Sequence, residues 1–115
     1  MTFNQKDIVL IPIPFTGLSS KKKRPVVIIS NDNYNRNNHD IVVAALTSNL
    51  DYRNEFCIEI DNDNLVTGQL PQKSQIRCDK IYTFSKSIDV KKFNKINNET
   101  FELIKQKVTA LTDNK

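Results

Sequence analysis

Three short runs of branched apolar residues, each bounded by polar or turn-forming residues, constrain the fold of this chain more than any other feature. The runs are Asp7–Phe15, Arg24–Ser30 and Asp40–Ser48. Because they are short and rich in Val and Ile, they predict β-strands rather than helices. Pro12 and Pro14 in the first run indicate an edge strand or a strand end, since proline cannot donate a hydrogen bond to a neighbouring strand.

Three further segments have the composition of strands. Glu55–Ile60 mixes apolar and polar residues in a way that suits one solvent-exposed face. Leu65–Leu70 predicts a short strand and Ser74–Phe84 a long one. The polar stretches Thr16–Lys23 and Asn31–His39 predict a turn and a loop with room for one helical turn.

The hydrophobic period changes near the C-terminus. Apolar residues recur at helical spacing at Phe101, Ile104, Val108 and Leu111. Asn98 precedes them and is a suitable N-cap, so we expect one amphipathic helix here. Five or six short strands and one helix predict a mainly β fold, a small and strongly bent β-barrel closed by a C-terminal helix. The length of 115 residues suits a single domain, which we assign to residues 1–115.

The charge of the chain is unevenly distributed. Lys and Arg number 17 against 13 Asp and Glu, for a formal net charge of +4. Residues 1–30 carry +4, residues 31–60 carry −3 and residues 61–115 carry +3. This balance permits nucleic-acid binding but does not demonstrate it.

Composition argues against several other classes of protein. No apolar run approaches the roughly 18 residues that a membrane span needs, and the first residues do not resemble a secretory signal, so we expect a cytoplasmic protein. Cys57 and Cys78 lie inside strand-like runs, which does not indicate a disulfide framework. One His and two Cys show no spacing typical of a zinc site, so no metal or cofactor is predicted.

The clearest candidate for phosphate binding is Arg24. It follows Lys21, Lys22 and Lys23, which have the composition of a solvated turn but could also bind RNA. Pro25 holds Arg24 in an extended backbone conformation at the start of an apolar strand. A guanidinium in that position offers planar, bidentate donors suited to a phosphate.

Three further places could carry chemistry. Thr47 ends an apolar strand, where its hydroxyl either bonds the local backbone or donates to a phosphate oxygen. Arg77 and Asp79 are two apart on a predicted strand, so they share a face while Cys78 turns to the core. Such a pair is either a surface ion pair contributing under about 1 kcal/mol or an acid–base and anion-binding pair. His39 lies in a polar loop and is expected to be solvated.

Four strings in order carry a resemblance to a known family. They are Asp7–Leu10, Lys23–Asp32, Ala45–Ser48 and Ile76–Ile81. Together with the predicted C-terminal helix, they resemble the MazF/PemK family of toxin ribonucleases from bacterial toxin–antitoxin systems. The resemblance extends from residue 7 to about residue 111. It implies an SH3-like barrel of the CcdB/MazF type with a C-terminal helix.

The resemblance also implies an activity. The family cleaves single-stranded RNA, usually mRNA, without a metal: the 2′-hydroxyl attacks the adjacent phosphorus and leaves a 2′,3′-cyclic phosphate and a 5′-hydroxyl. Arg24 and Thr47 match the family's Arg-Pro arginine and strand-end threonine, and Arg77 and Asp79 match an Arg and an Asp that some members use in catalysis. Arg24, Arg77 and Thr47 would stabilise negative charge on the phosphoryl oxygens, and Asp79 would accept the 2′-hydroxyl proton.

The family's assembly implies two protein partners. These are a second copy of the chain, in a homodimer, and a small antitoxin whose flexible acidic segment would bind near residues 21–24. Two other functions remain open. One is a nucleic-acid-binding barrel of the same family that does not cleave. The other is a gyrase-directed toxin of the CcdB type, which would be expected to lack the Arg-Pro and Arg-x-Asp strings.

Overall fold

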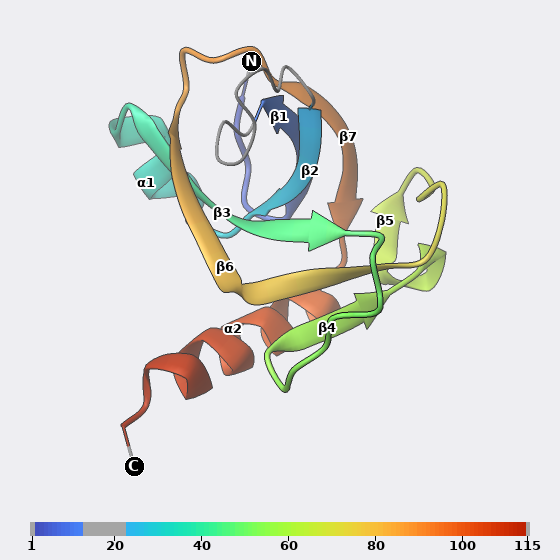
Figure 1. Cartoon of the computed structure of the whole chain (residues 1–115). Coiled ribbons are helices and arrows are strands. Elements are labelled where there is room, and N and C mark those ends of the chain that lie inside the picture. The colour runs from blue at the N-terminus through green and yellow to red at the C-terminus, as the bar shows by residue number, and fades with distance from the viewer. Residues whose placement is uncertain (1, 13–22, 115) are drawn as a thin grey trace, which may run out of the picture.

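The computed structural model describes residues 2–12 and 23–114 (Figure 1). This part of the chain contains seven strands, namely β1 (Asp7–Pro12), β2 (Lys23–Ile28), β3 (Asp40–Thr47), β4 (Cys57–Ile60), β5 (Leu65–Thr67), β6 (Ser74–Ser85) and β7 (Lys91–Ile96). Its helices are α1 (Asp32–Asn37), the 3-10 helix η1 (Asn62–Asn64) and α2 (Asn98–Thr112). The predicted strand end at residues 13–15 and most of the predicted turn, residues 16–22, lie outside the described residues.

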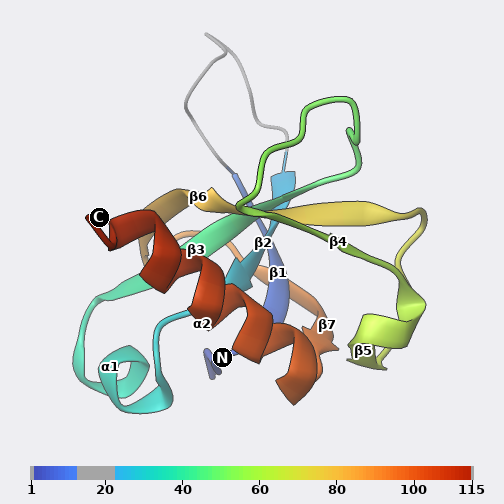
Figure 2. The same ribbon diagram turned by 90° about the horizontal axis from the view of Figure 1, so that it is seen from below.

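The strands form one antiparallel sheet in the order β4-β6-β3-β2-β1-β7-β5. The sheet curls strongly, so that β1, β2, β3, β6 and β7 are arranged as a half-barrel in Figure 1. Helix α2 crosses beneath the sheet and contacts β6 and β4 (Figure 2). The predicted mainly β fold, a small barrel closed by a C-terminal helix, is confirmed.

Both faces of the central strands are buried, because their side chains belong to two apolar clusters. Ile8 and Val27 belong to the cluster that also contains Ile104 of α2. Their chain neighbours Val9 and Val26 belong to the second cluster. All five side chains are at most 1% exposed. Burial on both faces explains why β1, β2 and β3 appear in the sequence as continuous apolar runs and not as alternating ones.

Helix α2 begins one residue earlier than predicted. Its N-cap is Asn97, not Asn98, because the Asn97 side chain accepts a hydrogen bond from the backbone N–H of Thr100 at 2.8 Å. Phe101 and Ile104 are buried against the sheet, as the helical spacing predicts.

The Asn-rich segment after β2 is more ordered than a loop. Asp32–Asn37 form the short helix α1, where the sequence indicated at most one helical turn. The Asn31 side chain caps it by accepting from the Tyr34 N–H at 2.7 Å. The buried side chain of Asn35 donates to the Ser30 carbonyl at 3.0 Å, which ties α1 to the end of β2.

Strand β7 is absent from the sequence-based prediction. It pairs with β1, and its lysines neutralise a carboxylate that the fold buries completely. The Nζ atoms of Lys92 and Lys95 lie 3.1 and 3.7 Å from the carboxylate oxygens of Asp7, whose side chain is 0% exposed. Because these lysines pair with Asp7, the strand carries charge where a strand pattern would show apolar residues.

Strands β4 and β5 are shorter than predicted. Strand β4 begins at Cys57 rather than at Glu55. Strand β5 ends at Thr67, because Gly68 adopts φ of +79°, which is incompatible with an extended strand. Cys57 is partly buried, Cys78 is buried, and both are free thiols, as expected.

Candidate active site

The register of three neighbouring strands brings the candidate residues to one face of the sheet. Val26 of β2 lies opposite Ala45 of β3, and Ala45 lies opposite Arg77 of β6. In the next row, Thr47 lies opposite Gln75. Thr47 and Arg77 are therefore diagonal neighbours on the same face, a relation that places side-chain origins about 7–8 Å apart.

Arg24 of β2 lies on the same face of the sheet. It lies two residues before Val26, so alternation along the strand gives it the same side of the sheet as Ala45 and Thr47. Arg24 is exposed, whereas Thr47 is partly buried and its Oγ1 accepts from the Asn49 N–H at 3.1 Å. The bond between Thr47 and the backbone confirms one of the two interpretations open from the sequence and leaves the hydroxyl hydrogen for another acceptor.

Arg24 and Thr47 line one open cavity of 480 Å³ at the ends of β2 and β3. Its apolar wall is formed by Leu10, Pro25, Leu46, Leu70, Pro71 and Phe93. Lys91 adds a second positive charge, and none of the described residues that line the cavity is acidic. A cavity with apolar walls and a cationic rim suits a ligand that carries both a flat apolar group and an anion.

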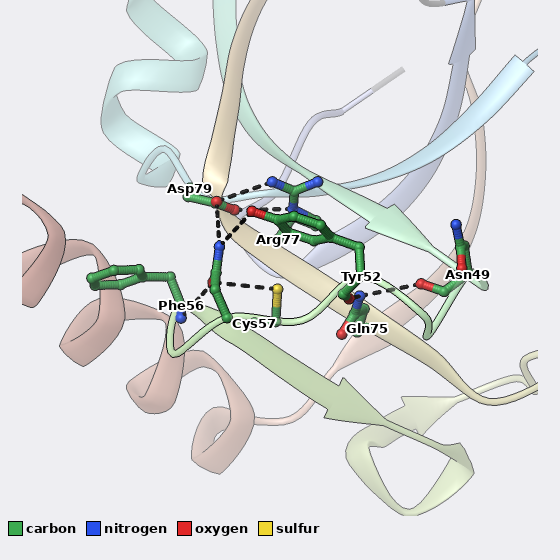
Figure 3. A network of polar contacts seen from close by, with 8 residues as sticks. Asn49, Tyr52, Phe56, Cys57, Gln75, Arg77 and Asp79 are labelled. Atoms are coloured by element: carbon green, nitrogen blue, oxygen red, sulfur yellow. Dashed lines mark hydrogen bonds and ion pairs between the residues drawn. The ribbon is translucent and has the colours of Figure 1, made fainter.

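Arg77 and Asp79 form the ion pair that their spacing predicts. The Arg77 Nε and Nη2 atoms each donate to a different oxygen of Asp79, both at 3.0 Å, as Figure 3 shows. Cys78, between them, is 0% exposed and turns to the core. The pair lies where β6 changes register against β3: Arg77 is opposite Ala45, and Ile81 is opposite Ala44. The three β6 residues in between form a bulge, a feature that re-aims side chains.

The loop between β3 and β4 encloses this ion pair. The Asn54 side-chain amide donates to Asp79 Oδ2 and to the Tyr52 hydroxyl, both at 2.9 Å. The Arg77 Cζ atom lies 4.1 Å from the centre of the Tyr52 ring, a cation–π contact (Figure 3). The buried Gln75 side chain donates to the Tyr52 carbonyl at 2.6 Å and holds the loop backbone.

The pair is strongly ionised. Hydrogen bonds from Arg77, and secondarily from Asn54, lower the pKa of Asp79 to about 2. The hydrogen bond to Asp79 raises the pKa of Arg77 above its ordinary value. A carboxylate of such low pKa, with both oxygens engaged, is a poor proton acceptor but an effective anchor for a guanidinium.

Of the three lysines predicted to bind RNA, the structure describes one. Lys21 and Lys22 lie outside the described residues. Lys23 begins β2, and its Nζ forms an ion pair with Asp89 at 2.9 Å. His39 is exposed at the end of the segment after α1, as expected for a solvated residue.

Tyr52, Asn54 and Gln75 were not identified from the sequence. Asn54 and Asp79 are 25 residues apart, and no local pattern relates them. The one available indication was an aromatic residue in the otherwise polar segment 51–55.

Two broader features of the described residues bear on function. Within residues 2–12 and 23–114, no three His, Cys, Asp or Glu side chains gather closely enough to hold a metal ion. None of the helices in the same part of the chain is long and apolar enough to cross a bilayer.

Comparison with known families identifies the chain. Residues 4–112 match the family described as PemK-like, MazF-like toxins of type II toxin–antitoxin systems. The chain belongs to this family. Among proteins with curated functions, none matches the sequence. The match covers the PemK-like chain from before β1 to the last turn of α2 and therefore includes Arg24, Thr47, Arg77 and Asp79.

Solved structures confirm the fold of this PemK-like chain. MazF from Deinococcus radiodurans superposes with a TM-score of 0.73 at 15% identity, covering 96% of each chain. A MazE–MazF structure from the same organism has a TM-score of 0.72 at 16% identity and covers 96% of this chain and 95% of that one. A mycobacterial endoribonuclease in complex with its cognate antitoxin has a TM-score of 0.70 at 16% identity, covering 95% and 91%.

Proposed function

We propose that this chain is the toxin of a type II toxin–antitoxin pair and that it cleaves single-stranded RNA in the cytoplasm. The observation that carries the proposal is the register that places Arg24, Thr47 and Arg77 on one face of three adjacent strands. Two guanidinium groups and a hydroxyl on one face supply donors for the oxygens of a phosphodiester. Membership of the toxin family supports the same conclusion.

The proposed reaction is an internal transfer at phosphorus. The 2′-oxygen of a ribose forms a bond to the adjacent phosphorus while the bond from phosphorus to the 5′-oxygen breaks. The products are a 2′,3′-cyclic phosphate and a 5′-hydroxyl, so atoms and charge balance once the leaving oxygen gains a proton. Arg24, Arg77 and the Thr47 hydroxyl stabilise the negative charge that develops on the phosphoryl oxygens, and no step requires a metal.

We assign Asp79 to positioning rather than to proton transfer. From the sequence it was expected to accept the 2′-hydroxyl proton. A pKa of about 2 makes its carboxylate too weak a base for that task at neutral pH. Its two hydrogen bonds instead fix the orientation of the Arg77 guanidinium. In this proposal the proton of the 2′-hydroxyl leaves to solvent.

The same surface suits an acidic antitoxin segment. Arg24 and Lys91 lie on the rim of a cavity whose described lining holds no acidic residue, so a peptide with carboxylates and apolar side chains would complement it. Such a segment would cover Arg24 and Thr47 and thereby block RNA.

We also propose a homodimer. Ile81 of β6 and Leu103 and Leu111 of α2 are 38%, 43% and 39% exposed, and we assign these apolar side chains to the partner surface. Sedimentation at high micromolar concentration tests this assembly, and a monomer there would contradict it.

The cleavage proposal is tested with purified protein and a long single-stranded RNA. We expect cuts that primer extension maps to defined positions, with 5′-hydroxyl ends, and activity that persists in EDTA. An absence of cutting by the wild-type protein, with salt-sensitive RNA binding retained, would replace the proposal with the non-cleaving binding barrel. An absence of both would refute RNA as the target.

A further inference from the structure

Tyr52 is an exposed aromatic residue whose side chain makes two contacts and whose backbone makes a third. Its ring lies against the Arg77 guanidinium at 4.1 Å. Its hydroxyl oxygen accepts from Asn54 at 2.9 Å, and its carbonyl accepts from Gln75 at 2.6 Å. Despite these contacts, Tyr52 remains 48% exposed. Tyr52 therefore combines a largely exposed ring with contacts that fix its orientation on the loop.

The position of Tyr52 is not explained by packing of the core. It belongs to neither apolar cluster, and its ring contacts polar groups of the site instead. Because Arg77 covers one side of the ring, the exposed area of Tyr52 is available to a second flat group. A rigid aromatic surface that faces water loses little conformational entropy when such a group stacks on it.

The surroundings of Tyr52 connect it with the proposed phosphate site. Tyr52 follows β3 by five residues, and the segment between them is held by bonds from Gln75 to the carbonyls of Asn49 and Tyr52. Gln75, whose buried side chain bonds the Tyr52 carbonyl (Figure 3), lies opposite Thr47 in the register, so Tyr52 is held by the strand neighbour of Thr47. Arg77 is both the ring's cationic partner and a member of the proposed charge-stabilising set.

We propose that Tyr52 is a stacking site for one unpaired base of the RNA, next to the phosphate held by Arg24, Thr47 and Arg77. The inference rests on the proposed RNA cleavage and assigns one subsite to it. Proteins that bind single-stranded nucleic acid combine cationic groups for the backbone with aromatic rings for the bases, and both are present here in direct contact. An RNA base is favoured over an apolar peptide side chain because the ring is paired with a guanidinium, which also stacks on bases.

Two substitutions distinguish the contribution of the Tyr52 ring to RNA binding from that of its hydroxyl. Tyr52→Phe keeps the aromatic surface and loses the bond to Asn54, whereas Tyr52→Leu removes the surface. The probe is a single-stranded RNA oligonucleotide in which the cleaved linkage, once mapped, carries a 2′-deoxyribose and cannot react. We expect Tyr52→Phe to bind it within about 3-fold of wild type and Tyr52→Leu to bind at least about 10-fold more weakly. Tyr34→Leu, which alters a tyrosine of α1, should leave the affinity unchanged.

An abasic scan of the same oligonucleotide identifies the base. Wild type should lose affinity strongly when one particular base is removed, and Tyr52→Leu should be insensitive at that position only. This coupling distinguishes stacking from a merely structural effect, which would weaken binding equally for every oligonucleotide. Circular dichroism of each variant verifies the fold.

The possible failures are distinct. If wild type cleaves RNA but Tyr52→Leu binds every oligonucleotide as wild type does, the stacking site is wrong and the cleavage proposal stands. If Tyr52→Leu lowers the cleavage rate with an unchanged abasic profile, the residue only positions Arg77, and the stacking site is again wrong. If wild type neither binds nor cleaves any RNA, both proposals fail.

Discussion

The Arg77 guanidinium is bound edge-on by the Asp79 carboxylate, through one 3.0 Å hydrogen bond from Nε and another from Nη2. Two parallel bonds leave neither group free to rotate, and the two side chains are only 18% and 17% exposed. The carboxylate therefore determines where the guanidinium points, and this relationship has consequences for both activity and stability.

The first prediction concerns how Asp79 contributes to cleavage. Arg77→Ala should lower the rate about 10²–10³-fold, the usual cost of losing one charge-stabilising donor. If Asp79 acts only by holding Arg77, adding Asp79→Asn to Arg77→Ala should change the rate by less than about 3-fold. Single-turnover rates of the four proteins of this cycle provide the measurement. A further loss of about 10²-fold or more in the double variant would restore Asp79 as a proton acceptor.

The second prediction is a loss of stability in acid. The pKa of Asp79 is lowered to about 2 from an ordinary value of 3.8, so its contribution is fully present above pH 3.8. It is lost as the pH falls through about 2. We expect this group to contribute roughly 1–2 kcal/mol, because the pair borders solvent and is partly screened. Urea unfolding of wild type and Asp79→Asn between pH 2 and pH 6 should show the difference converging in acid, and a constant gap would contradict this.

The third prediction concerns Arg24. Arg24→Ala should reduce cleavage about 10²–10³-fold while leaving the unfolding midpoint within experimental scatter, because the residue is exposed and at a strand end. Arg36→Ala is the matched control, since Arg36 is an exposed arginine on α1. Equal activity of both variants would place the reaction elsewhere on the surface.

The fourth prediction concerns the lysines before β2. Replacing Lys21, Lys22 and Lys23 with alanine should weaken binding of all single-stranded RNA sequences alike and flatten the salt dependence. Each lysine that contacts a phosphate contributes about 0.7 to the slope of log affinity against log salt concentration. Lys23 should contribute least, because its Nζ already pairs with Asp89 at 2.9 Å. Titrations at several salt concentrations measure the slope, and a change limited to certain sequences would argue against simple phosphate contact.

The fifth prediction tests the fold at Gly68. A left-handed conformation costs a residue with a Cβ about 1–2 kcal/mol, so Gly68→Ala should be destabilising by at least that amount. The added Cβ would also lie 1.9 Å from Asn94 Oδ1, which increases the cost. In an Asn94→Ala background the cost of the left-handed backbone and the close contact with the Phe93 carbonyl, 3.2 Å from the added Cβ, should remain. Denaturant midpoints of the four proteins measure both contributions, and equal effects in the two backgrounds would show that Asn94 moves away freely.

Several features of this protein follow from local sequence. The strands β1, β2 and β3 were predictable because both of their faces are buried, which requires continuous apolar runs. Helix α2 was predictable from the spacing of Phe101 and Ile104. The contact between Arg77 and Asp79 was predictable because residues two apart on a strand share a face.

Other features depend on contacts between residues far apart in the chain. Strand β7 was missed because its lysines, Lys92 and Lys95, pair with Asp7, some 85 residues earlier in the chain. A segment rich in lysine does not resemble a strand unless the buried carboxylate that pairs with it is known. The α1 segment was underestimated because its Asn residues act as caps and buried donors, roles that depend on where β2 ends.

The sequence by itself determined the type of most elements and four candidate residues, since hydrophobic period and strand alternation are local properties. Only the tertiary structure decided how those residues are arranged and which groups they contact. The register shift in β6 sets Arg77 beside Tyr52, and Asn54 reaches across 25 residues to Asp79. The hydrogen bonds from Arg77 and, secondarily, from Asn54 lower the pKa of Asp79 to about 2, which is why we propose it as an anchor for Arg77 and not as a proton acceptor. A carboxylate's proton affinity depends on all the donors that surround it in space. The spacing along the chain indicates Arg77 as one donor to Asp79 but gives no indication of Asn54, which is 25 residues away.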